Sequence, residues 1–330
     1  MWVAHGSLVA HASATCVRDT FGRMTKGGRP VNIELRPYSD TDFVELHAAL
    51  AEWTREAGGC GYCHPGYLAH LLYEKLRGHA LAERVQLWQQ HGCIVGISIN
   101  GLFESSFISY VSPTLRGTQA ELVMLQAAYQ ATCHYLRTRQ LSEAPVNTDV
   151  YSCDTPRITV LRAMGFRQHR VWDTITERSL STPLPGIALP EGFTLRSAVL
   201  DDYAELALLH NDAFGEDWTP EMYRDRVMLK PGYQPEHEII VVAADGRLAA
   251  FTTIRLDNLN NVGLFEPVGT RPVFQRRGLA RAMLLHGLAQ MHKLGMRRAR
   301  VEYDTSNQAA HALYASLGFE KLYETLGYEV

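Results

Sequence analysis

A strand end, a proline turn and the start of a helix follow one another between Val268 and Ala280, in the order VGTRPVFQRRGLA. A helix N-terminus leaves backbone N–H groups unpaired and carries a partial positive charge. Gly278 and the small Ala280 let this backbone approach a ligand, and Arg276 and Arg277 add positive charge. These features suit the binding of a pyrophosphate. Taken alone, the segment also fits a simpler interpretation, in which the glycine serves a tight turn and the arginines face water.

A second segment, residues 307–319, reads NQAAHALYASLGF. Together with residues 275–280 it resembles two motifs of the GNAT superfamily of N-acetyltransferases, Q/R-x-x-G-x-G/A and N-x-x-A-x-x-x-Y-x-x-x-G-F. Both motifs occur in the order of that superfamily and on the expected elements. The resemblance covers residues 193–330 well and residues 31–180 weakly. The tandem arrangement is most similar to the mycothiol synthase group.

The resemblance implies that acetyl-CoA is the cosubstrate and that no metal is required. The backbone amides of residues 276–280 would hold the CoA pyrophosphate, and the strand at 262–270 would pair with the pantetheine arm. Pro267 cannot donate to a ladder and Gly269 weakens one, so we expect this strand to part from a neighbour and leave a slot. The cofactor-binding residues implied by the resemblance are Val268, Thr270, Gln275, Arg276, Arg277, Gly278, Leu279, Ala280 and Asn307.

Acetyl transfer to an amine needs a neutral amine, stabilisation of charge on the carbonyl oxygen and a proton for the departing thiolate. In the GNAT superfamily a tyrosine on the last helix often protonates the sulfur, and Tyr314 matches it by position. Its apolar neighbours at helical spacing also suit an aromatic residue of the core. The two interpretations are compatible, because a buried tyrosine still places its hydroxyl at a polar partner.

The general base is harder to assign. In the superfamily it is often a glutamate fourteen residues before the first glycine of the motif, and Leu264 occupies that position here. Glu266 lies two residues later on the same predicted face, about 7 Å along the strand, and is the predicted base, acting directly or through a water. The alternative is a strand-end acid that faces solvent. Glu302 and Asp304, at the end of the next predicted strand, are the reserve candidates.

The chain repeats itself once. RPYSDTDFVEL at residues 36–46 resembles RSAVLDDYAEL at residues 196–206, and both halves end on a Gly-Phe pair. A stretch rich in proline separates the halves and suits a linker. The predicted organisation is a disordered extension over 1–30, a degenerate domain over 31–180, a linker over 181–192 and a catalytic domain over 193–330.

The first half departs from the glycine motif. With the loop prolines of the two halves aligned, the first glycine of the motif falls on Gln119 and the small residue after it on Glu121. A carboxylate at that place would repel a pyrophosphate, and Leu161 stands where the second half has Tyr314. We therefore expect the first half to be non-catalytic, as a scaffold or as one wall of the acceptor cleft.

Hydrophobic periodicity defines the elements of the second half. The predicted strands are Glu238–Ala244, Leu248–Leu256, Val262–Thr270 and Arg298–Tyr303, and the predicted helices are Arg277–Leu294 and Asn307–Leu317. The first half shows a similar order. Together they predict an α+β fold with two tandem domains, each a mixed, mostly antiparallel sheet flanked by helices.

Composition excludes several classes. Hydrophobic residues make up 46% and charged residues 20%, as in ordinary globular domains, and the net charge of −3 gives no support to nucleic-acid binding. The apolar runs fall short of the roughly 18 residues that a spanning helix needs, so a membrane role is not expected. The start of the chain is a poor secretion signal, because it has no positive region and histidines interrupt its apolar stretch. We therefore interpret the six cysteines as reduced, in a cytoplasmic protein.

The run Cys60-Gly61-Tyr62-Cys63-His64 has the spacing of a c-type haem attachment site, and its cysteine pair also suits zinc or redox chemistry. Haem attachment would need export, and zinc would need a second ligand pair. We interpret the two residues as chance cysteines in a glycine-rich turn.

The expected function is acetyl-CoA-dependent N-acetylation of a primary amine on a small molecule. One alternative, which Leu264 favours, is an acyl-CoA-binding or sensing paralogue with little activity. Another is an enzyme acting on peptide N-termini or lysines. Neither the acceptor nor the oligomeric state follows from the sequence, because loops whose geometry it does not define form the acceptor pocket.

Overall fold

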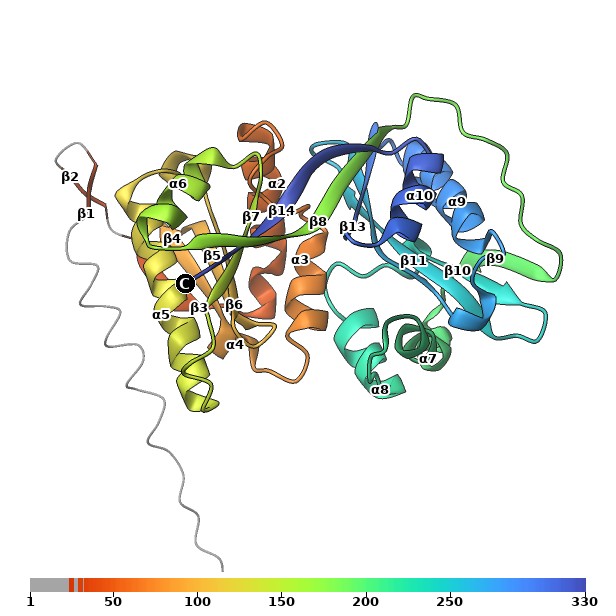
Figure 1. Ribbon diagram of the computed structural model, residues 1–330, viewed down its shortest axis with the longest axis horizontal. Helices are drawn as coiled ribbons and strands as arrows, with labels where there is room; N and C mark the ends of the chain where they lie inside the picture. The colour runs from red at the N-terminus through yellow and green to blue at the C-terminus, as the bar shows by residue number, and fades with distance from the viewer. Residues whose placement is uncertain (1–23, 27–28, 32) are drawn as a thin grey trace, which may run out of the picture. The chain divides into compact units, whose positions relative to one another are not determined.

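The computed structural model describes residues 24–26, 29–31 and 33–330 (Figure 1). The chain forms two compact units, each built from two separate stretches. Unit 1 contains the described residues up to Tyr38 together with Ala82–Val146, and unit 2 contains Ser39–Leu81 together with Asn147–Val330. The predicted domain limits at 31–180 and 193–330 follow the sequence repeat and not these contacts, and they remain a prediction.

Unit 1 has an antiparallel sheet whose strands follow the chain in the order β3, β4, β5 and β6. The long helix α5 packs on β5 and β6, and Trp88, Val111 and Met124 are buried in the core between them. The elements are β3 (Glu34–Pro37), α4 (Leu81–Arg84, at the start of the second stretch), β4 (Val85–Gln90), β5 (Cys93–Leu102), β6 (Ser106–Val111), η4 (Pro113–Leu115) and α5 (Gln119–Thr138).

Part of the expected N-terminal extension forms a short hairpin. β1 (Met24–Lys26) pairs antiparallel with β2 (Arg29–Val31), and the expectation of disorder over 1–30 remains a prediction. The part of that prediction over residues 1–23 lies outside the described residues.

The sheet of unit 2 has the order β7, β14, β8, β13, β12, β11, β10, β9. Its neighbours pair antiparallel except for β12 and β13, which are parallel. The predicted mixed, mostly antiparallel α+β fold is therefore confirmed. The strands are β7 (Asn147–Tyr151), β8 (Arg167–Ser179), β9 (Phe193–Ser197), β10 (Glu238–Ala243), β11 (Leu248–Asp257), β12 (Val262–Thr270), β13 (Arg298–Asp304) and β14 (Glu320–Glu329).

The two halves of the sequence exchange their last strands within this sheet. β8 ends the first half, yet it pairs with β13 of the second half. β14 ends the second half and pairs with β7 of the first half. The expected linker between the halves has no regular secondary structure over residues 183–190, and its Leu184 and Leu189 pack on the core beneath α9.

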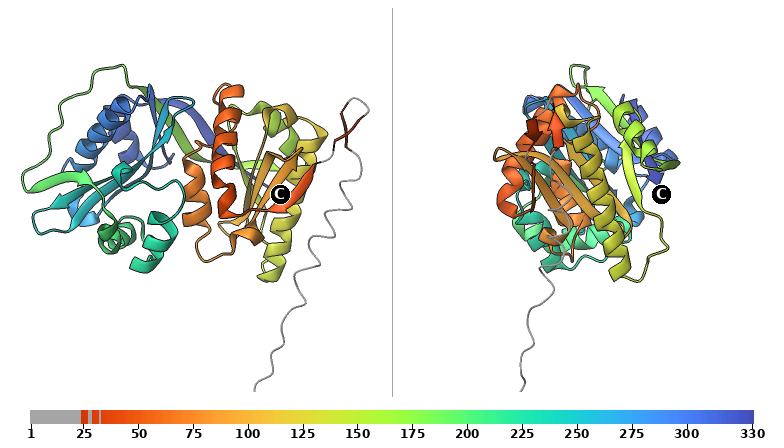
Figure 2. Two further views of the ribbon diagram at one scale, coloured as in Figure 1. Left: turned by 180° about the vertical axis from the view of Figure 1, so that it is seen from behind. Right: turned by 90° about the vertical axis from the view of Figure 1, so that its left-hand side faces the viewer.

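Helices cover both faces of the unit 2 sheet (Figures 1 and 2). α9 and α10 pack over Val241 and Phe265, whereas α7 and α8 pack over Ile240 and Phe251. Successive residues of a strand point to opposite faces, so one apolar strand serves both cores. The helices and turns of unit 2 are η2 (Asp40–Asp42), α2 (Phe43–Glu56), α3 (Tyr67–Ala69), the π-helical η3 (His70–Lys75), α6 (Thr155–Ala163), η5 (Leu200–Asp202), α7 (Tyr203–Phe214), α8 (Pro220–Tyr223), η6 (Arg224–Met228), η7 (Pro235–His237), η8 (Pro272–Phe274), α9 (Leu279–Lys293) and α10 (Gln308–Ser316).

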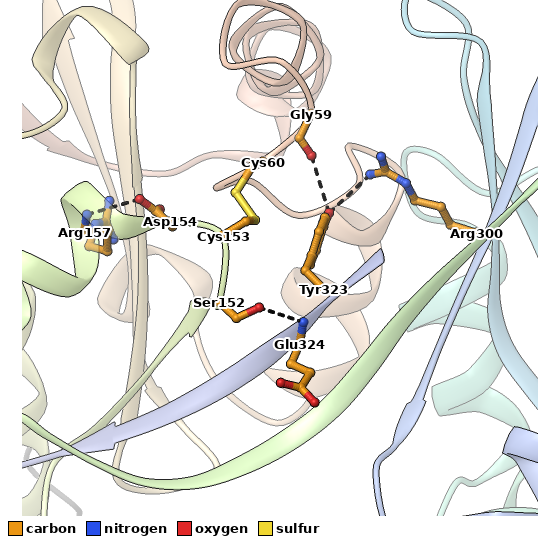
Figure 3. The surroundings of a disulfide bond; sticks show 9 residues. All are labelled: Gly59, Cys60, Ser152, Cys153, Asp154, Arg157, Arg300, Tyr323 and Glu324. Atoms are coloured by element: carbon orange, nitrogen blue, oxygen red, sulfur yellow. Dashed lines mark hydrogen bonds between the residues drawn. A yellow bond between two sulfur atoms is a disulfide. The ribbon is translucent and has the colours of Figure 1, made fainter. Parts of the chain in front are cut away.

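A disulfide joins Cys60, in the loop after α2, to Cys153, between β7 and α6 (Figure 3). Their Cα atoms are 6.3 Å apart, within the usual range for such a bond. The interpretation of all cysteines as reduced is therefore wrong for this pair, which spacing could not reveal because the partners are far apart in the sequence. Cys63, Cys93 and Cys133 form no disulfide within the described residues, and Cys16 lies outside them.

Candidate active site

An opening in the unit 2 sheet lies where β12 and β13 part. Their parallel ladder joins Val262–Phe265 to Arg298–Val301 and extends no further among the described residues. On its other side β12 stays paired with β11 up to Thr270, through a bulge in which Glu266 and Pro267 lie opposite a single residue. The predicted parting of this strand is confirmed. It leaves one backbone edge of β12, beyond Phe265, open to a ligand.

The loop before α9 forms a backbone cradle for an anion. Arg276 and Gly278 both lie in the left-handed region, with φ of 62° and 82°. The helix begins at Leu279, two residues later than predicted, because Gly278 is its N-cap and has no side chain to cap it. The first N–H groups of α9 therefore lack intrahelical partners. A Cβ at Gly278 would meet nothing within 4 Å, so open space adjoins these groups.

Three of the predicted cofactor-binding side chains hold the local structure together. The Gln275 amide donates to the Thr270 carbonyl at 3.1 Å, and Arg277 donates to a loop carbonyl at 3.2 Å. The Asn307 side chain accepts a backbone N–H at 3.0 Å as the N-cap of α10. Arg276 is exposed and available to a ligand. The contacts of these residues with acetyl-CoA remain predictions.

The other predicted cofactor-binding residues contribute through their backbone. Val268 and Thr270 are half-buried and pair with β11, so their opposite edge faces the opening. The side chain of Leu279 is buried in the core and Ala280 is half-buried, which leaves their N–H groups as the parts that can meet a phosphate.

Tyr314 has its ring in the apolar core and its hydroxyl near the opening. The ring lies 5.6 Å from that of Tyr303 and 6.0 Å from that of Phe319, measured between centroids. Within the described part of the chain, its hydroxyl has no hydrogen-bond partner. Burial raises the pKa of Tyr314, and the negative charge of Glu266 raises it further. The phenol is thus protonated at any working pH and lies close to the predicted base.

Glu266 lies at the bulge and shares the opening with acids from two other strands. Its side chain is 21% exposed. Burial raises the pKa of Glu302 to about 8, the charges of Glu266 and Asp173 add to the rise, and Arg300 opposes it. Burial also raises the pKa of Asp173 to about 6, with contributions from Asp304 and Glu266. Near neutral pH Glu302 therefore holds a proton, whereas the position of Glu266 suits it to accept one from an incoming amine.

Asp304, the second reserve candidate, is an exposed acid of the turn after β13. Its carboxylate accepts hydrogen bonds from the backbone N–H and the hydroxyl of Ser306, which lower its pKa. A carboxylate held in this way is a weak base, so the geometry favours Glu266.

A buried chain of charged groups lies behind Glu266 and was not predicted. His70 Nε2 is 3.7 Å from Glu266 Oε1, and His70 Nδ1 is 2.9 Å from Glu74 Oε2 without a well-aligned hydrogen bond. Arg255 donates to the other Glu74 oxygen at 3.2 Å. Burial alone would raise the pKa of Glu74, but the charges of His70 and Arg255 hold it well below its usual range. His70 thus connects the predicted base to a buried carboxylate whose pKa is lowered.

Tyr67 completes the acidic side of the opening. Its ring stacks on His70 with 5.1 Å between centroids. Burial raises the pKa of its phenol, and the negative charges of Glu266, Glu302 and Asp173 raise it further. The spacing of His70 and Glu74 places them on one helical face, a weak signal available in the sequence. The contacts of His70 with Glu266 on β12 and of Glu74 with Arg255 on β11 depend on the tertiary fold.

The corresponding loop of unit 1 is closed by its own carboxylate. The Gly117 N–H donates to Glu121 Oε2 at 2.5 Å, and the Thr118 hydroxyl accepts from Ala120 N–H at the N-cap of α5. Glu121 is fully buried. The carboxylate thus occupies the place that a phosphate would need, which supports the prediction that this loop does not bind CoA.

Comparison with known proteins identifies the part of the chain that contains the opening. Residues 203–319 match the Acetyltransferase (GNAT) family. They form a GNAT acetyltransferase domain. The GNAT domain therefore includes the β12 opening, the cradle of α9 and Tyr314, which the sequence motifs predicted together.

Relatives of this domain are named mycothiol acetyltransferase. One from Nocardia farcinica is 32% identical over 189 residues, which cover 53% of this chain and 61% of that protein. Another, from a Nocardioides species, is 26% identical over 307 residues, covering 85% and 95%. The chain spans 57–63% of the length of the curated relatives that it matches at 29–33% identity.

A solved structure extends the likeness to the whole fold. The tandem GNAT protein from the clavulanic acid biosynthesis pathway covers 91% of this chain and 98% of its own at a TM-score of 0.61, with 15% identity. At this identity the likeness shows the fold alone, and that fold is a tandem GNAT arrangement.

The structure also bears on metal or haem binding and on membrane-spanning helices. Among the described residues, no group of three or more histidine, cysteine or acidic side chains could hold a metal ion. Cys60 is in a disulfide and His64 is buried with hydrogen bonds to both ring nitrogens, so neither is available to zinc or haem. Within the same residues, no helix is both long enough and apolar enough to cross a membrane.

Proposed function

We propose that the protein is an acetyl-CoA-dependent N-acetyltransferase acting on a primary amine of a small molecule. The observation that carries the proposal is the end of the β12–β13 ladder at Phe265. Glu266 follows this point directly on β12, and the ring of Tyr314 lies 5.6 Å from that of Tyr303 on the parted end of β13. The thioester, the amine, the acid and the base can all be held within this one opening.

The cradle before α9 fits the pyrophosphate of acetyl-CoA. Two left-handed residues, Arg276 and Gly278, turn the backbone so that the uncapped N–H groups of a 15-residue helix face open space. Such groups bind phosphate oxygens well. The pantetheine arm would then continue along the open edge of β12 toward Glu266.

Two proton transfers of the reaction can be given to residues of the site. Glu266 takes a proton from the acceptor ammonium, directly or through a water, and the neutral nitrogen attacks the thioester carbonyl. The nitrogen of the tetrahedral intermediate loses its surplus proton to solvent, the intermediate collapses with cleavage of the carbon–sulfur bond, and the thiolate takes the proton of the Tyr314 hydroxyl. The Tyr314 hydroxyl is protonated at neutral pH, and solvent returns a proton to the phenolate after the transfer.

The buried His70 and Glu74 position the base. His70 bridges Glu266 and Glu74, so it fixes the carboxyl of Glu266 at the bulge and offers a route for its proton. We treat His70 as a positioning residue, because its contact is with Glu266 and not with the reacting atoms.

The acceptor and the cellular location belong to the same proposal. The names of the relatives make a mycothiol-type acceptor one candidate, alongside other small amines. A cytoplasmic location remains a prediction, and in that compartment the Cys60–Cys153 bond would respond to redox conditions.

Thiol release from acetyl-CoA tests the proposal on a panel of aminosugars, amino acids, polyamines, a mycothiol-type amine and a peptide N-terminus. We expect turnover with at least one small amine and none with Gly278→Asp. Acetyl-CoA binding with no turnover across the panel would favour the sensing alternative, and turnover with the peptide alone would favour a protein acetyltransferase.

A further inference from the structure

A second hollow lies on the polar face of β12 and β13, at the end of these strands away from Glu266. It is a cavity of about 260 Å³, and the first residues of both strands, Val262 and Arg298, line it. The loop after α2 forms another wall through Gly58 and Gly59. All of its lining residues belong to unit 2.

Positive charge dominates the lining of this cavity. Arg55, Arg298 and Arg300 contribute guanidinium groups, and Asp257 contributes the one carboxylate among the lining residues. Both oxygens of Asp257 already accept hydrogen bonds from Asn260, at 3.1 and 2.6 Å. The cavity therefore offers donors to a ligand and few acceptors.

Arg298 and Arg300 share a single counterion. Glu177 accepts from Arg298 at 3.4 Å and from Arg300 at 2.8 Å, through different oxygens. Two positive charges held by one carboxylate leave an excess that an anion would neutralise. Arg55, by contrast, is ion-paired with Glu52 at the surface.

Arg300 is buried, with a side chain only 7% exposed. Its Nη1 is 3.4 Å from the hydroxyl of Tyr323, which also reaches the Gly59 carbonyl at 3.5 Å (Figure 3). Within residues 33–330, no acceptor lies within hydrogen-bond distance of its Nη2. A guanidinium nitrogen that faces a cavity and has no acceptor from the protein is a typical site for a carboxylate or phosphate oxygen.

The wall beside Arg300 is tethered covalently. Cys60 follows Gly59 directly, and its disulfide to Cys153 anchors this loop to the segment after β7 (Figure 3). Gly58 and Gly59 both have positive φ, 71° and 90°, and a Cβ added at Gly59 would lie 3.7 Å from Arg300 Nη2, so the backbone passes close to the guanidinium there. A wall fixed in this way lowers the entropic cost of binding a ligand.

The same face of the sheet carries negative charge at its other end. Glu302 follows Arg300 by two residues on β13 and so points to the same side, about 7 Å further along. Glu266 on the adjacent β12 and Asp173 on the adjacent β8 add their negative charge there. An amine attracted to these acids would lie several bonds away from a group bound by the arginines.

Building on the proposed function, we propose that the acceptor is an amine that also carries a carboxylate or phosphate, and that Arg300 and Arg298 bind this acidic group in the cavity. The separation of the two ends favours an aminosugar phosphate or an ω-amino acid. An α-amino acid holds its two charges too close together to reach both.

Matched acceptor pairs test this proposal by initial-rate kinetics of thiol release. The pairs are glucosamine with glucosamine 6-phosphate, and 4-aminobutanol with 4-aminobutyrate, which separate phosphate from carboxylate recognition. We expect kcat/KM to be about 10- to 100-fold higher for one of the anionic members, the effect of a charge-assisted hydrogen bond. Arg298→Gln and Arg300→Met should lower that ratio toward one, whereas Arg224→Met, which removes a surface arginine paired with Asp225, should leave it unchanged.

Each outcome has a separate meaning. If Arg300→Met fails to fold because Glu177 loses its partner, the half-exposed Arg298→Gln still reports the ratio. Equal rates for both members of each pair, unaffected by Arg298→Gln, would overturn the acidic acceptor and leave the acetyltransferase proposal intact. No turnover with any amine would count against the proposed function. The cavity can then be tested without turnover, by measuring at constant ionic strength whether inorganic phosphate raises the Tm of the wild type more than the Tm of Arg298→Gln. An equal shift in both proteins would overturn the anion site.

Discussion

The loops before α5 and α9 start alike and end differently. Each begins with a proline turn, η4 or η8, and each has a left-handed residue four positions after the proline, Gly117 with φ of 69° and Arg276 with φ of 62°. In unit 1 the helix then starts at once, with Thr118 as its cap and Glu121 accepting the Gly117 N–H. In unit 2 one more residue intervenes before the cap, and the cap itself is a left-handed glycine.

This comparison shows how little separates an anion site from a closed turn. Both loops leave N–H groups at a helix start. In one, a hydroxyl and a buried carboxylate of the chain itself satisfy them. In the other, Gly278 adds no cap and the space beyond it is open. Whether such a loop can bind an anion thus depends on whether side chains of the protein already satisfy the N–H groups at the start of the helix.

The largest expected effect comes from placing a carboxylate in the open loop. Gly278→Asp should weaken acetyl-CoA binding by at least about 100-fold, because a negative charge would face the pyrophosphate as Glu121 does in unit 1. Calorimetry on the folded variant measures this. Gly278→Asn has the same shape, tolerates positive φ and is neutral, so it should retain most of the affinity. Equal losses in both variants would show that shape and not charge is responsible.

The next effect concerns Tyr314. It is the seventh residue after the N-cap of α10, Leu161 holds the same position in α6, and both side chains are buried. Tyr314→Phe keeps the ring in the core and removes the hydroxyl. It should lower kcat by about 10²–10⁴ with little change in CoA affinity. Tyr303→Phe, which removes a neighbouring hydroxyl bonded to His311, is the control and should have a small effect. If Tyr314→Phe is fully active, Tyr314 is not the catalytic acid and only packs in the core, as Leu161 does.

A smaller effect is expected for the base and its support. Glu266→Gln should depress kcat/KM mainly at low pH, where the amine arrives protonated, and the rate should recover as pH rises. His70→Gln should move the pH–rate profile in the same direction by roughly tenfold or less, because it disturbs the position and not the presence of the base. If Glu266→Gln and His70→Gln both keep the wild-type pH–rate profile, Glu266 is a surface acid and not the base, and Glu302 should be tested next.

The smallest effect is on stability. The pKa of Glu302 in the folded protein is about 8 against an ordinary 4.5, so folding favours its protonated form. Its contribution to stability is complete below pH 4.5 and is lost as pH rises through 8. The Tm of wild type should therefore fall more between pH 5 and 9 than that of Glu302→Gln. Asp304→Asn, whose parent carboxyl has a lowered pKa, should not reduce this fall; identical slopes for Glu302→Gln and wild type would contradict the account.

Local pattern was enough to predict the elements around the site. Apolar runs predicted the strands β10 to β13, and helical spacing predicted the helices α9 and α10. The start of α9 was misplaced because periodicity cannot show that Gly278 adopts a left-handed conformation. Tyr314 and Glu266 remain predicted acid and base, and the structure brings both to the opening.

What escaped prediction came from contacts between distant segments. His70 and Glu74 reach Glu266 from the first half of the chain, and Asp173 arrives on β8 through the strand exchange. The disulfide has the same origin, since six cysteines do not define their own pairing. Such neighbours follow from topology, which short motifs do not encode.

The number of acetyl-CoA molecules bound per chain tests the central claim most directly. Titration calorimetry of the wild-type protein should give one site, because the loop of unit 1 is closed by Glu121 and that of unit 2 is open. Gly278→Asp should remove this site, and Glu121→Gln should leave both the count and the affinity unchanged. Two equivalent sites in the wild type, or binding that survives Gly278→Asp and disappears in Glu121→Gln, would contradict the assignment of the two loops.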